Sequence, residues 1–100
     1  VMAEDGMVVV LVKIDDKTNK LVGEPDIITR GFIYVKSSDR LLFETKQKIR
    51  HTIIAATSKT MTDKIEDWNN VRGLLRDDLS DFFFKETERR PMILPVIIKV

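Results

Sequence analysis

Few side chains in this sequence are suited to acid–base or metal chemistry. His51 is the only histidine, and there is no cysteine. A zinc site with nitrogen or sulfur ligands therefore cannot be assembled from these 100 residues. His51 falls within a predicted helix and has no evident nucleophile as a partner, so we interpret it as an ordinary exposed or half-buried histidine rather than a general base.

Carboxylates offer one alternative. Asp77, Asp78 and Asp81 cluster on a predicted helix, where they could in principle hold magnesium. We favour a solvated helix face whose acids are balanced by neighbouring arginines and Lys85. The sequence contains neither a G-x-S-x-G motif nor a phosphate-binding glycine loop. We therefore predict no catalytic residue, no metal site and no cofactor in this chain.

Basic residues suggest a binding role. Arg30 and Lys36 flank the stretch "GFIY", in which Phe32 and Tyr34 are candidate exposed aromatics. Arginines beside aromatic rings can hold single-stranded RNA by phosphate contact and base stacking.

Arg89 and Arg90 follow a predicted helix directly and carry two interpretations. They are candidates for RNA contact together with Arg30 and Lys36. Alternatively, they stabilise the end of that helix and pair with Glu86 or Glu88. We favour the structural role.

Three consecutive phenylalanines, at positions 82–84, cannot all point into one core from a helix. An exposed aromatic suits contact with another chain, although a small and incomplete core would use it equally well. With the apolar C-terminal strand, this makes Phe83, Phe84 and Ile97 candidates for an association surface.

The composition fits one globular domain over residues 1–100, with 43% hydrophobic and 33% charged residues. We expect a soluble protein with no membrane segment, because the apolar run "MVVVLV" is too short to span a bilayer. A net charge of +1 argues against gripping nucleic acid by bulk charge. The absence of cysteine fits a reducing cytoplasm, and a start at Val1 leads us to expect a piece of a longer protein.

The chain alternates between strand-like and helix-like patterns. Met7–Ile14 is rich in valine and predicts a strand covered on both faces. The extended stretch from Leu21 is expected to be irregular, because glycine and proline interrupt it. A third strand is predicted over Met92–Val100, and Pro95 places it at a sheet edge or pairs it through its other side.

Two helices are predicted between these strands. The first begins near Ser37 and Ser38, which are good capping residues. Gly73 within the second helix suggests close backbone packing there. The predicted apolar faces are Leu42, Ile49, Ile53 and Ala56 for the first helix, and Trp68, Val71, Leu75, Leu79 and Phe82 for the second. The order strand, strand, helix, helix, strand predicts an α+β two-layer sandwich, with a three-stranded sheet covered on one face by two helices.

Three stretches, "EDGMVVVLVKID", "PDIITRGFIYVKSS" and "RRPMILPVI", resemble the C-terminal domain of bacterial ribonuclease J in order and spacing. The resemblance covers nearly the whole chain. It implies a cytoplasmic parent protein that degrades and matures RNA, with zinc held by histidines and aspartates in a separate catalytic region. The family's H-x-H-x-D-H motif is absent here, so no catalytic residue carries over.

The resemblance also implies a role in self-association and in full activity of the parent. Our first hypothesis is therefore an accessory domain that forms a dimer or tetramer, with RNA as a partner through the parent protein. The alternative is an RNA-contacting module that uses the local basic residues. A stand-alone enzyme is the weakest of the three hypotheses.

Overall fold

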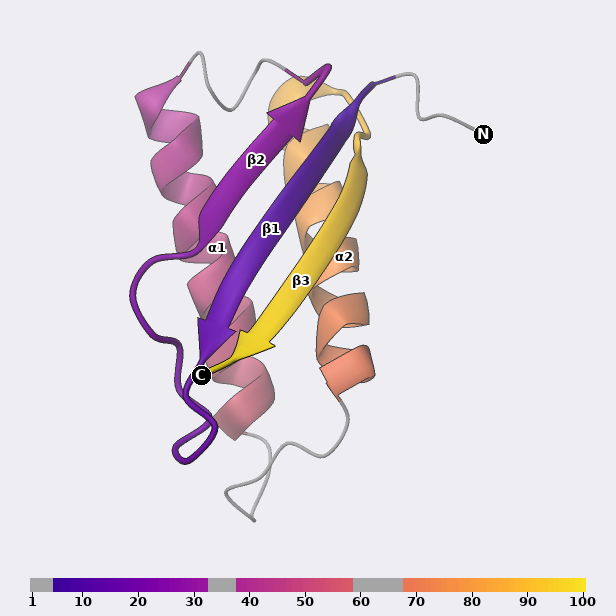
Figure 1. The fold of residues 1–100 in the computed structure, drawn as a ribbon. Coiled ribbons are helices and arrows are strands. Elements are labelled where there is room, and N and C mark those ends of the chain that lie inside the picture. The colour runs from indigo at the N-terminus through magenta and orange to yellow at the C-terminus, as the bar shows by residue number, and fades with distance from the viewer. Residues whose placement is uncertain (1–4, 33–37, 59–67) are drawn as a thin grey trace.

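The computed structural model describes residues 5–32, 38–58 and 68–100, which form two layers (Figure 1). A mixed sheet of three strands forms one layer, and two helices cover one of its faces. The elements are β1 (Met7–Ile14), β2 (Asp26–Arg30), α1 (Asp39–Ser58), α2 (Trp68–Thr87) and β3 (Met92–Lys99). This confirms the predicted α+β fold and its element order. Within the described ranges, no helix is both long and apolar enough to cross a membrane.

β1 is the central strand of the sheet. β2 pairs with it antiparallel on one side, and β3 pairs with it parallel on the other. Pro95 lies opposite Val10 on β3, an edge strand, as its missing N–H group predicts. The stretch before β2 is irregular, as expected, because only an isolated bridge between Ile14 and Leu21 precedes the strand.

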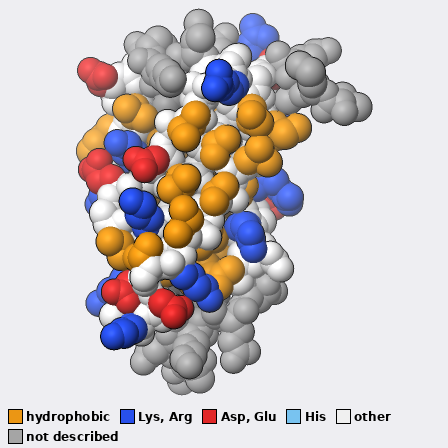
Figure 2. Space-filling view, viewed as in Figure 1, with side chains coloured by type: hydrophobic (Ala, Val, Ile, Leu, Met, Phe, Trp, Pro, Cys, Tyr) orange, Lys and Arg blue, Asp and Glu red, His pale blue; other side chains and the backbone are white. Residues whose placement is uncertain are grey.

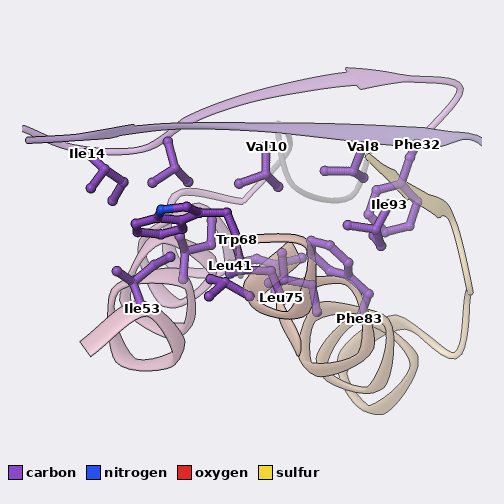
Figure 3. Close-up of a cluster of buried hydrophobic side chains, with 14 residues drawn as sticks. Val8, Val10, Ile14, Phe32, Leu41, Ile53, Trp68, Leu75, Phe83 and Ile93 are labelled. Atoms are coloured by element: carbon purple, nitrogen blue, oxygen red, sulfur yellow. The ribbon is translucent and has the colours of Figure 1, made fainter. Parts of the chain in front are cut away.

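The core lies between the sheet and the helices (Figure 3). Every second residue of β1 points toward the helices and is completely buried, namely Val8, Val10, Val12 and Ile14. Strand alternation produces this row, and burying each such side chain contributes about 1.5–3 kcal/mol. The central strand therefore supplies the floor of the core.

α1 begins where the sequence predicts. The Oγ of Ser38 accepts a hydrogen bond from the backbone N–H of Leu41 at 3.1 Å, as a helix cap does. The buried face starts at Leu41 rather than Leu42, which is only half-buried. Thr45 also belongs to this face and is completely buried. Its hydroxyl donates a hydrogen bond to the carbonyl oxygen of Leu41 at 2.7 Å, so burial leaves no unpaired polar group on this side chain.

α2 packs with Trp68, Val71, Leu75, Leu79 and Phe83 inward. Phe83 therefore replaces the predicted Phe82 on the buried face, and Phe82 is half-buried beside it. The prediction of close backbone packing at Gly73 is wrong. A Cβ atom added there would meet nothing within 4 Å.

Candidate interaction surface

The second face of the sheet is mostly apolar, with Lys13 as an exposed charged residue on β1, and is not covered by the described helices. Figure 2 shows hydrophobic side chains gathered across this face. We call this surface the open face; it comprises Met7, Val9, Leu11, Ile28, Met92, Leu94, Val96 and Ile98. The members on β2 and β3 are between 38% and 47% exposed, and those on β1 are half-buried between them.

Strand register makes the open face continuous. Val9 lies opposite Ile28 on one side and Leu94 on the other, which gives a central apolar row across all three strands. Met7 and Met92 continue the surface toward one end of the sheet, and Leu11 and Val96 continue it toward the other. Contiguous exposed apolar patches of this kind are typical of interaction sites.

Coverage of β1 differs from the sequence prediction. Its dense valines predict a strand buried on both faces, but within the described part of the chain only the face toward α1 and α2 is covered. Val9 and Leu11 thus have the character of buried residues without a second layer over them. A partner that supplies this layer would account for their composition.

Charged residues border the open face (Figure 2). Ile27 packs against the core, so strand alternation directs Asp26, Ile28 and Arg30 to the opposite side. Asp26 and Arg30 are both exposed, at the two ends of β2. The apolar surface therefore ends in a negative group at one end of β2 and a positive group at the other.

The residues predicted for association lie in different environments. Phe83 is completely buried, and Ile97 packs against the core from β3, so neither belongs to an accessible surface. Phe84 is 44% exposed, and the guanidinium carbon of Arg90 lies 4.3 Å from its ring centroid. The useful sequence signal lay in "MILPVIIK", where the outward set of alternate positions, Met92, Leu94, Val96 and Ile98, is entirely apolar although the inward set is also largely apolar.

The predicted RNA-contact residues are brought together in part. Arg30 ends β2, while Arg89 and Arg90 precede β3, and these positions meet at one end of the sheet (Figure 1). Lys36 and Tyr34 lie outside the described residues. Phe32 is 1% exposed and belongs to the core, which corrects its interpretation as an exposed stacking aromatic.

Arg89 and Arg90 contact acids at this end of the sheet. Nη1 of Arg89 lies 3.6 Å from Oδ1 of Asp5. The backbone N–H of Arg90 donates to Oδ2 of the same carboxylate at 2.8 Å. Nη1 of Arg90 lies 3.9 Å from Oδ1 of Asp81. These contacts support the expected structural role and add Asp5 and Asp81 as acidic partners.

The acidic cluster on α2 resembles a solvated face. Oδ2 of Asp78 accepts a hydrogen bond from the Thr52 hydroxyl at 2.8 Å, and Asp77 lies 3.4 Å from Nε of Arg76. Among the described residues, no group of three or more histidines or carboxylates is arranged to hold a metal ion.

His51 is exposed on α1. It lines a shallow hollow of about 340 Å³ between the helices, together with Glu44, Gln47, Lys48 and Phe82. No serine, threonine or cysteine nucleophile is among these lining residues. This hollow therefore offers no nucleophile–base pair of the kind that covalent catalysis uses.

Comparison with known proteins gives a consistent result over the whole chain. Residues 1–100 match the family described as the ribonuclease J C-terminal domain. The chain is 35% identical over 99 residues to ribonuclease J2 of Bacillus subtilis, and 36% identical over 99 residues to a ribonuclease J 2 of Staphylococcus aureus. Each match covers 99% of this chain but only 17% of the relative.

Proposed function

This chain belongs to the ribonuclease J C-terminal domain family, and on that premise we propose that it is an association domain of a longer ribonuclease. In this proposal two copies join through their open faces. The observation that carries the proposal is the contiguous apolar surface on the uncovered side of the sheet.

A second copy is a physically suitable partner. Aligned sheets pack face to face about 10 Å apart, with side chains from both inner faces forming a common core. The open face presents aliphatic side chains and methionines from three paired strands, which suits this packing. Association of identical copies through one shared surface is the commonest arrangement in homo-oligomers.

The catalytic work would belong to another part of the parent. The relatives are named ribonucleases, and this chain corresponds to 17% of their length. We propose that pairing of this domain holds two catalytic regions in one particle and so supports RNA decay and maturation. Zinc, which the family resemblance implies, would be held by residues outside this chain.

Light scattering combined with size-exclusion chromatography tests the association. The purified chain should elute at twice the 11.6 kDa of one copy at high concentration and dissociate on dilution. Leu94→Glu should yield a folded monomer, because it places a charge in the central row of the open face.

Leu74→Glu provides a matched control. Leu74 lies on α2 and is 40% exposed, almost the same as Leu94 at 42%, but it is not part of the open face. This variant should remain a dimer, and circular dichroism should show that both variants are folded. A wild-type chain that stays monomeric at all concentrations, or a Leu94→Glu variant that still forms dimers, would contradict the proposal.

RNA contact is a second proposal, favoured by the convergence of Arg30, Arg89 and Arg90 at one end of the sheet. It has less support, because Asp5 and Asp81 lie beside two of these arginines and reduce the local positive charge. It predicts binding of single-stranded RNA that weakens with salt and falls when Arg89 and Arg90 are both replaced by alanine. No detectable binding at low salt would exclude it.

A further inference from the structure

The charge pattern along β2 indicates how a second copy would be oriented. Asp26, Ile28 and Arg30 occupy alternate positions of this strand and share the side that faces away from the helices. Within the described part of the chain, neither Asp26 nor Arg30 forms an ion pair. Four residues of an antiparallel strand span about 13 Å, so the two groups are too far apart to pair within one copy.

Cross-strand register places each charge at the end of a row. Arg30 lies opposite Met7, which lies opposite Met92. Asp26 lies opposite Leu11, which lies opposite Val96. Between them lies the uncharged row of Ile28, Val9 and Leu94. These three rows are thus symmetric in shape about the central one, and β2 carries opposite charges on its two sides. A fourth row, Lys13 opposite Ile98, extends the sheet beyond Leu11 and Val96 and adds an exposed positive group at the Asp26 end.

If the strands of the two sheets are roughly aligned, two symmetric ways exist to lay one such sheet on a second copy. A twofold axis along the strands would place β2 over β3 of the other copy. Arg30 would then lie over Met92 and Asp26 over Val96, so that each charge faces an apolar side chain. Desolvating a charge against an apolar group is unfavourable, which argues against this arrangement.

A twofold axis across the strands, through the central row, has the opposite effect. It places β2 over β2 with the strand directions reversed, so the two ends of β2 exchange places. Arg30 of each copy then faces Asp26 of the other, while Met7 faces Leu11 and Met92 faces Val96. Within these three rows, charges meet opposite charges and apolar side chains meet apolar side chains.

We propose that two copies pair through their open faces about this transverse axis, with reciprocal Arg30–Asp26 ion pairs that set the orientation. This inference rests on the proposed association and adds its geometry. The sheet spacing of about 10 Å is within reach of an arginine and an aspartate extended toward each other, and the usual rotation of about 30° between aligned sheets is within the freedom of the arginine side chain. Opposite charges at an interface chiefly select orientation and partner, which is the role assigned here.

Charge reversal tests the orientation by sedimentation or light scattering. Arg30→Asp and Asp26→Arg should each weaken self-association by about tenfold or more, because each places like charges opposite one another twice per dimer. The double variant with both reversals should associate as the wild type does. The two single variants, when mixed, should form a heterodimer in preference to either homodimer, because opposite charges then face each other at both sites. Native mass spectrometry distinguishes these species if one variant carries a mass label.

A matched control separates register from net charge. Asp16→Arg changes the net charge as Asp26→Arg does, but Asp16 is exposed in the turn after β1 and is not part of the open face. Mixing it with Arg30→Asp should give no equivalent preference for the heterodimer. Equal preference in both mixtures would show that bulk charge alone drives pairing, and would overturn the proposed register.

The experiments distinguish a wrong register from the absence of association. If both single reversals form dimers as the wild type does, while Leu94→Glu is monomeric, the open face is the interface but the transverse register is wrong. If the wild-type chain is monomeric throughout, both proposals are wrong.

Discussion

Phe32 packs edge-on against Phe83, with ring centroids 5.2 Å apart and planes inclined by 65°. Phe32 lies two residues beyond β2, and Phe83 lies near the end of α2. Gly31 separates the end of β2 from Phe32. Its φ of +70° turns the chain toward the helix layer. This contact joins the end of the edge strand to the second helix and closes that end of the core.

Replacing Phe83 should therefore be costly. Phe83→Ala should lower the free energy of unfolding by about 3–5 kcal/mol, because it leaves a cavity at a completely buried position. Phe84→Ala, at the adjacent and 44% exposed position, should cost about 1 kcal/mol or less, mainly through loss of the Arg90 contact. Urea denaturation of both variants measures the difference, and equal losses would contradict the assignment of Phe83 to the core.

Two glycines should respond to alanine in opposite ways. Gly6 has a φ of +90°, and a Cβ atom there would lie 2.5 Å from the carbonyl carbon of Gly31. Gly6→Ala should therefore cost about 2 kcal/mol or more, through backbone strain and the clash. Thermal and urea denaturation would measure this loss.

Gly73 provides the internal comparison. It lies inside α2, and a Cβ atom there would have open space around it. Gly73→Ala should raise the free energy of unfolding by about 0.5–1 kcal/mol, because alanine favours the helix and reduces the entropy of the unfolded chain. A loss of stability would indicate that the helix surface at Gly73 is occupied.

The hydrogen bond between Thr52 and Asp78 links the two helices. Thr52 is 7% exposed, and its hydroxyl donates to the carboxylate at 2.8 Å. Thr52→Val should cost about 1–2 kcal/mol, because a charged acceptor loses its partner in a partly buried site. Asp77→Asn, one residue from Asp78 but exposed, should change stability little. A double-mutant cycle of Thr52→Val with Asp78→Ala should show coupling, and additive effects would contradict this contact.

Periodicity was sufficient to predict the layers and most of the core. Ile49, Ile53, Leu75 and Leu79 follow the helical period, and the valine-rich run of β1 predicted a core strand although not which of its faces stays uncovered. Pro95 correctly indicated an edge position, because a residue without an N–H group is poorly suited to a central strand. These features depend on local chemistry that the sequence shows directly.

The sequence was less informative where several solutions share one pattern. Three adjacent phenylalanines satisfy a helical period with either Phe82 or Phe83 inside, and the position of Phe32 decides in favour of Phe83. A valine-rich strand likewise looks the same whether its second cover comes from its own chain or from another. The open face was therefore missed, although its residues were noted as apolar.

Two adjacent residues of β3 should separate folding from association. Ile93 is 4% exposed and points into the core, while Leu94 is 42% exposed on the open face. Ile93→Ala should lower the free energy of unfolding by about 3 kcal/mol, through the cavity it creates. Leu94→Ala should cost the dilute, monomeric chain about 1 kcal/mol or less, because much of this side chain is already in contact with water.

The Leu94→Ala variant should also shift the dimer dissociation curve to higher concentrations, since Leu94 lies in the central row of the proposed interface. Urea denaturation at low concentration and light scattering over a dilution series measure the two effects separately. If Leu94→Ala weakened folding as much as Ile93→Ala and left association unchanged, the open face would be part of the fold and not a surface for a partner.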